Sequence, residues 1–587
     1  MGENTESDTG QHDKNYYLVK RGNKTYAYRS TSKYDKNKKG PVAETEYLGL
    51  YDEKTKSLIP KKRRITERNP LDLVDLKSRR FGASYLLFKI AEEIGLRDDL
   101  FNSLGGDCEK ILASSIAQVL TGGPQSSTED AVEGCIIREL LGIGGTFASP
   151  RMSELSANLG TNYGGLETLF EKRLRRAGKM LSYDLTSTST YSTINGWAEF
   201  GYNRDGESNM KQMNIGLVTD KRGVPAMFEI YPGSIPDVAT LKRTVDRVAE
   251  LKGEGSTMVM DRIFGSAANL AFLLDNHVSF VMPGKKNTKV IKTIMSNLSK
   301  NNTNSDYMQI YNGVTYTVME FKIGLLPKDP ASSNSSDDSN DLEEYDLILE
   351  DDERFALVPE TRQIKAYACY NAKKASDELN TLISNLTKIE KKLKETNPYK
   401  AVHSLKQIAG PYEKYFDVQI VDDKLRIERK KNAITFSMNR NGMFVMLTNG
   451  IDSWEDMMQC YDCRVYVEQA FDALKNELDG NRWRVKTPEV AKGRLVIKFI
   501  ALILWATLAA KLREQKSHDT VRAVLQSLDN IMAIGYQGEW KLTEITKRNR
   551  TYLDNLNIPM PELRMRLDDK EYIPQNYIDE WKKEHGA

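Results

Sequence analysis

The chain has 587 residues, a formal net charge of +2 and 40% hydrophobic residues. This length is sufficient for several domains, each with its own core. The balanced charge excludes a uniformly basic coat for nucleic acid, so any such surface must be local. Five cysteines and the lack of a recognisable signal peptide predict a protein of the reducing cytosol.

The N-terminal segment is locally basic. Residues 11–68 contain sixteen Lys and Arg against seven Asp and Glu, with tyrosines interleaved. Residues 16–30 and 41–54 read as short strands, and a KKRR run follows at 61–64. We expect a basic β-module over residues 1–68 that contacts nucleic-acid phosphates; a solvated basic surface is the alternative.

Residues 69–178 have a mainly helical pattern without a recognisable helix-turn-helix motif, and we expect them to form a further contact region. Beyond them, Asp184 lies inside an apolar and β-branched run that predicts a strand. Asp261 follows the apolar run Met258–Met260 directly. Because burying an unpaired carboxylate is costly, acids in these places favour a functional site. The alternatives are an ordinary turn acid for Asp184 and a helix N-cap for Asp261.

The segment from 288 to 450 has a mixed pattern. Residues 315–326 and 432–449 read as strands, and residues 371–395 as a long amphipathic helix. Residues 329–353 hold many acids and no base, which predicts a disordered acidic loop with no metal-binding role.

The most informative stretch is Y-x2-R-x3-E-x6-K, formed by Tyr461, Arg464, Glu468 and Lys475. On an ideal helix these four side chains share a stripe about 60° wide, beside a buried apolar face. A carboxylate flanked by cations suits a site that binds metal and phosphate together, although a solvated face with weak ion pairs gives the same pattern.

The cationic stretch 482–486 follows that helix, and we expect Arg482 and Arg484 to contact nucleic acid. Trp483 either stacks on a base or packs in the core. The pair Cys460 and Cys463 has no partner pair and predicts no zinc site. The apolar run 499–510 predicts a buried core helix, because it is too short to span a bilayer.

Asp184, Asp261 and Glu468 resemble the acid triad of insertion-sequence DDE transposases, in the group with a Y-R-E-K signature. The stretches 201–237 and 261–270 are also similar to that family. The resemblance implies a mixed α/β fold. Its RNase H-like core is a five-stranded sheet, with Asp184 on the first strand, Asp261 after the fourth and Glu468 on a later helix. The core is expected at 179–287 and 451–535. Between these parts a mostly β insertion is implied at 288–450. A C-terminal tail with a role in dimerisation is implied at 536–587.

The resemblance also implies an activity. The three acids would bind two Mg²⁺ ions, which Mn²⁺ can replace, and Tyr461, Arg464 and Lys475 would contact the DNA end. The protein would act as a homodimer in a synaptic complex at the terminal inverted repeats of its own element. It would cut and paste DNA beside the nucleoid of a prokaryotic cytoplasm, with no membrane partner. A catalytically silent DNA-binding regulator and an unrelated RNase H-like nuclease remain as alternatives.

Overall fold

The computed structural model describes residues 16–22, 24–35, 40–54, 56–60, 76–192, 195–201, 209–253, 255–328, 345–422, 424–485, 487–536, 539–562 and 564–566. The chain forms two compact units, Met1–Leu76 and Lys77–Ala587.

The smaller unit is an antiparallel sheet of four strands in chain order. The strands are β1 (Tyr17–Arg21), β2 (Lys24–Asp35), β3 (Gly40–Asp52) and β4 (Ser57–Pro60). The ring of Tyr28 packs against those of Tyr17 and Tyr47 across the strands, which is the cross-strand contact that tyrosines favour. The strands expected in this segment are therefore present, whereas the KKRR run at 61–64 lies outside the described residues.

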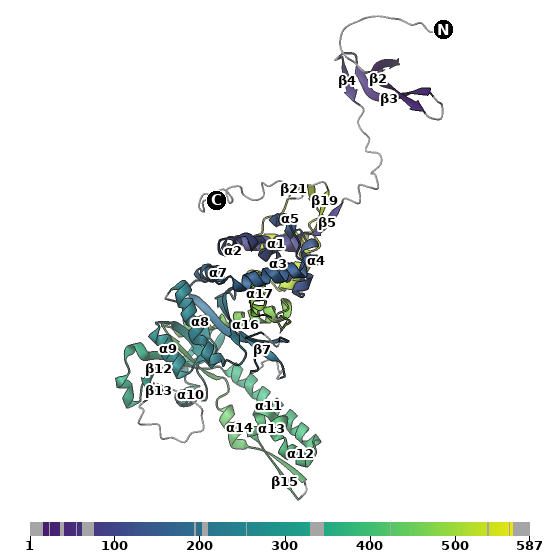
Figure 1. Cartoon of the computed structure of the whole chain (residues 1–587). Coiled ribbons are helices and arrows are strands. Elements are labelled where there is room, and N and C mark those ends of the chain that lie inside the picture. The colour runs from purple at the N-terminus through teal and green to yellow at the C-terminus, as the bar shows by residue number, and fades with distance from the viewer. Residues whose placement is uncertain are drawn as a thin grey trace, which may run out of the picture. The chain divides into compact units, whose positions relative to one another are not determined.

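The larger unit begins with strand β5 (Lys77–Arg80) and a group of helices, which confirms the helical pattern of this region. The helices are α1 (Gly82–Glu93), α2 (Leu96–Leu104), α3 (Cys108–Thr121), α4 (Thr128–Glu133), α5 (Ile137–Leu141), α6 (Ser149–Thr161) and α7 (Tyr163–Arg176). Figure 1 shows α1 to α5 gathered at one end of this unit.

The central sheet starts with five strands in the order β8-β7-β6-β9-β10. Their bounds are β6 (Met180–Thr190), β7 (Lys211–Asp220), β8 (Pro225–Pro232), β9 (Thr257–Met260) and β10 (Ser279–Pro283). The β6–β7 and β7–β8 pairs are antiparallel, whereas β9 runs parallel to both β6 and β10. The helices α8 (Asp237–Lys252) and α9 (Ala267–Asp275) connect these strands. This is the mixed five-stranded sheet expected from the sequence.

The segment after β10 extends the same sheet through β17 (Met443–Asn449), which pairs with β10. The further strands are β11 (Met308–Tyr311), β12 (Val314–Pro327), β13 (Tyr345–Leu349) and β14 (Gln363–Tyr370). The remainder comprises α10 (Lys289–Asn301), α11 (Ala372–Glu395), α12 (Pro398–His403), α13 (Leu405–Ala409), α14 (Lys431–Met438) and the hairpin β15 (Phe416–Val421) with β16 (Lys424–Arg429).

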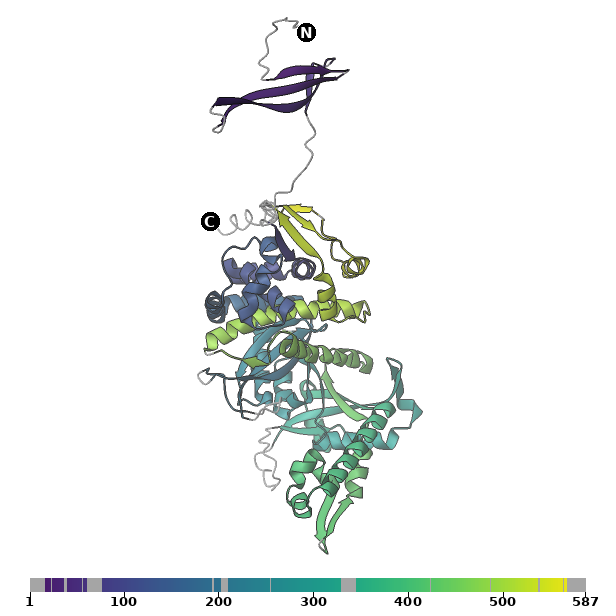
Figure 2. The same cartoon turned by 90° about the vertical axis from the view of Figure 1, so that its right-hand side faces the viewer.

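Three expectations for this segment are corrected. Its described residues contain slightly more α-helix than strand, because α11 and its neighbours build a small separate core around Leu386 and Phe416. Figure 2 shows these green elements projecting together from the sheet. Residues 432–438 belong to α14 and are not a strand. Within the acidic stretch, Tyr345–Leu349 forms strand β13, whose backbone pairs antiparallel with β12.

The chain returns to the centre through α15 (Trp454–Asp462), α16 (Arg464–Asp472), a π-helical turn (Ala473–Glu477), β18 (Arg482–Trp483) and α17 (Pro488–Glu514). It ends with α18 (Val521–Leu528), β19 (Met532–Tyr536), β20 (Glu539–Leu542), α19 (Lys547–Asn555) and β21 (Arg564–Arg566). Strands β5, β19, β20 and β21 form a second sheet.

Helix α17 is the core helix of the larger unit, as expected for the run at 499–510. Among the described residues it alone is long and apolar enough to span a membrane, but 89% of its apolar window is buried inside the protein. It packs against α3 and α6. At the crossing with α6, Gly493 lies against the backbone of Ser156, where any side chain would collide with the carbonyl oxygen.

Candidate active site

Asp184 lies in the middle of β6, within a strand that is buried along nearly its whole length. Its side chain is 7% exposed, and Oδ1 accepts a hydrogen bond from the amide of Leu185 at 2.8 Å. Carboxylates are rarely held this deep on a central strand, because burying a charge is costly. Its position therefore favours a functional role over that of an ordinary turn acid.

Asp261 directly follows β9, the parallel neighbour of β6. The register pairs Met260 with Tyr183, so that Asp261 and Asp184 come next along two adjacent strands. The Asp261 side chain is 34% exposed and also accepts a hydrogen bond from the amide of Arg262 at 2.5 Å. It thus caps the short helix Arg262–Phe264, so the N-cap alternative is observed, together with a position beside Asp184.

Glu468 is presented by α16, which packs against β6 and β7 through a buried face that includes Val467 and Phe471. One turn earlier on the same helix, Arg464 reaches both neighbouring acids. Its Nη2 lies 2.8 Å from Oε1 of Glu468 and 3.2 Å from Oδ2 of Asp261. A single guanidinium nitrogen therefore joins two of the three acids.

The electrostatics of Arg464 include the third acid as well. Burial lowers the pKa of its guanidinium, but the charges of Asp261, Tyr461, Glu468 and Asp184 outweigh this effect and raise the pKa overall. Its Nε is buried and has no hydrogen-bond partner among the described residues. The pKa of the Tyr461 hydroxyl is raised by burial and by the charges of Asp261 and Glu468, with Arg464 opposing. Arg464 is thus the electrostatic centre of the group.

The predicted stripe is not one continuous helix. Tyr461 belongs to α15, Cys463 is the joint, and α16 carries Arg464 and Glu468. Lys475 lies in the π-helical turn, where each residue advances by a smaller angle than in an α-helix. Tyr461, Arg464 and Glu468 do gather with the two aspartates, whereas the angular argument does not extend to Lys475.

Arg482 in β18 and Arg484 directly after it lie elsewhere. β18 pairs with the end of β6, where Arg482 Nη1 lies 3.3 Å from the hydroxyl of Tyr191 and Arg484 stacks over its ring. Trp483 is 3% exposed, and its Nε1 donates to the carbonyl of Gly480. Its packing in the core excludes stacking on a base.

The donor chemistry of the three acids fits Mg²⁺, which prefers hard carboxylate oxygens. Within the part of the chain that the structure describes, however, no three acidic, histidine or cysteine side chains are grouped as a ready metal site. Arg464 provides the positive charge between Asp261 and Glu468. The acids are therefore suitable ligands whose shared space holds a cation of the chain itself.

Comparison with known proteins agrees with this geometry. The family model described as "Transposase DDE domain" matches residues 178–504, which is more than half of the chain and includes all three acids. No curated protein shows significant similarity to the chain. The chain belongs to the transposase DDE domain family, and is thus a transposase whose substrate is DNA.

Proposed function

We propose that the chain is a cut-and-paste transposase of the Y-R-E-K group, which cleaves the ends of its own insertion sequence and joins them to target DNA. Asp184, Asp261 and Glu468 are its catalytic and metal-binding residues. The main support for the proposal is that all three acids surround Arg464. This arginine contacts Asp261 and Glu468 directly and also interacts electrostatically with Asp184.

In this proposal Asp184, Asp261 and Glu468 would hold Mg²⁺, which would supply activation of the attacking oxygen and neutralisation of charge on the phosphate. When DNA arrives, Arg464 releases the carboxylates of Asp261 and Glu468, because a phosphate of the DNA competes for its guanidinium group. Arg464 then turns to a phosphate of the DNA end, for which its planar fork is well suited. The Tyr461 hydroxyl donates to a neighbouring phosphate oxygen, and Lys475 contacts the backbone further along.

The core is RNase H-like, with the segment 288–450 inserted between its two parts, and the basic sheet of the N-terminal unit adds phosphate contacts. These contacts, the recognition of inverted repeats and the synaptic homodimer all belong to the proposal. They are supported by the basic composition of residues 11–68 and by the family.

The test incubates the purified protein with the DNA that flanks its gene, in Mg²⁺ and in EDTA, beside the Glu468→Gln variant. We expect metal-dependent nicking at a fixed position, which the variant loses while it still binds the same DNA. Specific binding without cleavage in any metal would contradict catalysis and favour the regulator. Cleavage by Glu468→Gln at the wild-type rate would exclude Glu468 from the site.

A further inference from the structure

A second group of cations lines a cavity of about 600 Å³ between three parts of the larger unit. We call it the cationic pocket. Its walls come from the loop before α4 and the first turn of α6, from the residues around β18, and from α17. The charged residues that line it are Asp479, Arg482, Arg484, Arg494 and Lys498.

The cationic pocket has too few acids for its cations. Asp479 is the sole acid among the described residues that line it, and its side chain is 47% exposed. Its carboxylate is 3.9 Å from Nζ of Lys498, an ion pair weakened by distance and solvent. The other partner of that ammonium group is the neutral carbonyl of Leu478.

The two cations that α17 contributes to the pocket, Arg494 and Lys498, are desolvated. Lys498 is 6% exposed, and Nε of Arg494 is buried with no hydrogen-bond partner among the described residues. Burial lowers the pKa of both groups, and Asp479 only partly opposes it. Because a buried charge without a counter-ion is costly, a ligand that supplies negative charge would be stabilised here.

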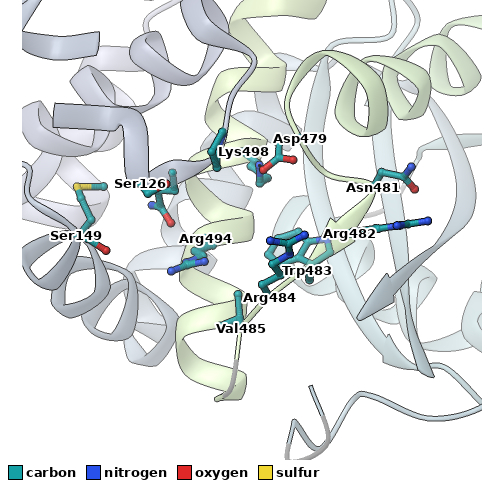
Figure 3. Close-up of a pocket in the computed structure, with 13 residues that line it drawn as sticks. Ser126, Ser149, Asp479, Asn481, Arg482, Trp483, Arg484, Val485, Arg494 and Lys498 are labelled. Atoms are coloured by element: carbon teal, nitrogen blue, oxygen red, sulfur yellow. The ribbon is translucent and has the colours of Figure 1, made fainter. Parts of the chain in front are cut away.

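The arrangement fits a phosphate group. Figure 3 shows Arg484, Arg494 and Lys498 around the cavity, with Ser126 and Ser149 on the opposite wall, while Arg482 points away. Guanidinium groups bind phosphate oxygens through paired hydrogen bonds, and an ammonium group adds a point charge. The volume is large enough for a phosphate together with its flanking sugars.

The distance between the cationic pocket and the acids can be estimated along β6. Arg482 of β18 pairs with Ser189 of β6, five residues beyond Asp184 on the same strand. At about 3.3 Å per residue this corresponds to roughly 17 Å. That span covers about five nucleotides of B-form DNA, at 3.4 Å per nucleotide along each strand.

We propose that the cationic pocket binds a backbone phosphate of the DNA, about five nucleotides from the bond that is cut, through Arg484, Arg494 and Lys498. This inference rests on the proposed function, which makes DNA the ligand. The pocket thereby holds the strand in register while the acids act on it. A free phosphate ion has the same chemistry, so the experiment must distinguish binding of free phosphate from binding of a DNA phosphate.

The experiment measures DNA binding by the full-length protein in EDTA, so that cleavage does not contribute. Arg494→Gln is compared with Arg175→Gln, which removes the same charge from the exposed face of α7. We expect Arg494→Gln to bind a labelled duplex of the flanking DNA roughly tenfold more weakly than the control. Its dependence of log affinity on log salt should be shallower by about one. Lys498→Met is the second variant, with its fold checked by circular dichroism.

A scan of single neutral methylphosphonate linkages along the duplex locates the phosphate. One linkage should weaken the wild type about as much as the substitution does, and should not weaken Arg494→Gln further. Equal binding by Arg494→Gln and Arg175→Gln at every salt concentration overturns the proposal. In a second outcome, inorganic phosphate raises the melting temperature of the wild type and of Arg175→Gln but not that of Arg494→Gln, while every linkage weakens DNA binding by Arg494→Gln and Arg175→Gln equally. The pocket then binds a free anion, and the DNA assignment is wrong. Nicking by the wild type is scored separately, so either proposal can fail alone.

Discussion

The candidate active site and the cationic pocket lie along the same strand, β6, and are opposite in charge balance. At the active site one arginine, Arg464, is surrounded by three acids and contacts two of them directly. In the cationic pocket Asp479 is the sole acid among the described lining residues, beside Arg484, Arg494 and Lys498. The first site has an excess of negative charge that only a cation can neutralise, and the second an excess of positive charge.

On the proposals above, this contrast would allow a protein with a net charge of only +2 to bind DNA. Within the larger unit, the acids would be the site for metal ions and the cationic pocket a site for phosphate. Arg464 would contribute at the first site, because a DNA phosphate could replace the acids as its partner when a metal ion neutralises them. The comparison leads to four predictions, beginning with the largest effect.

Removal of any one acid should affect cleavage alone. We expect Asp184→Ala, Asp261→Ala and Glu468→Ala each to lower the rate of strand cleavage by roughly 10³-fold or more, because each removes a metal ligand. Binding of end DNA should change little, since the cationic pocket is intact. Cleavage on sequencing gels and binding by fluorescence anisotropy give the two readouts. A variant that loses binding in proportion to cleavage would show that the two regions are not separate.

Gly493→Ala should disturb the wall of the cationic pocket. The added methyl group meets the carbonyl of Ser156 where α17 crosses α6, next to Arg494. We expect the free energy of unfolding to fall by about 2 to 3 kcal/mol, as for other overpacked contacts. Chemical denaturation measures it. The control is Gly164→Ala in α7, where the new methyl group meets nothing and should be neutral or stabilising.

Arg464→Gln should improve metal binding in the absence of DNA. The substitution removes the guanidinium that neutralises Asp261 and Glu468, so we expect about tenfold tighter binding of Mn²⁺. Electron paramagnetic resonance of free Mn²⁺ measures this without any cleavage assay. Arg222→Gln is the control, because it removes a half-exposed arginine that pairs with Asp220 instead. Unchanged or weaker Mn²⁺ binding by Arg464→Gln would mean that the arginine does not compete with the metal.

Local sequence patterns predicted the strands of the central sheet and singled out the acids, whereas the arrangement of the strands in one mixed sheet was implied by the family resemblance. An apolar β-branched run predicts a buried strand, and an acid inside or directly after such a run stands out. The contact of Arg464 with Asp261 joins residues 203 positions apart (464 − 261), which no local pattern encodes. The π-helical turn could not be predicted either, because the apolar residues before and after it keep the spacing of an uninterrupted α-helix.

The sequence predicts part of the cationic pocket, because Arg482 and Arg484 belong to a cationic stretch that is expected to contact nucleic acid. The other two cations, Arg494 and Lys498, were not predicted as part of it. Their spacing of four residues places them on one face of an apolar helix, which is the signal that could have identified them. Trp483, in contrast, could not be assigned from its neighbours, because exposed and buried tryptophans occur in the same kind of stretch.

The smallest expected effect concerns pH at the cationic pocket. The pKa of Lys498 is lowered from 10.5 to about 8, chiefly by burial and further by Arg494, with Asp479 opposing. Because the folded protein favours the neutral amine, the stability contributed by this group rises as pH increases from about 8 to 10.5. Phosphate binding has the opposite dependence, because it requires the charged form.

DNA affinity should therefore be constant well below pH 8, fall about twofold at the pKa of Lys498 and fall roughly fourfold half a pH unit above it. Anisotropy titrations in EDTA at several pH values measure the change. The matched variant is Lys498→Arg, which keeps its charge over the whole range and should show no such decrease. If the decrease persists in Lys498→Arg, another group titrates. If the wild type shows none, the ammonium group of Lys498 does not contact the phosphate, and Arg484 with Arg494 must hold it alone.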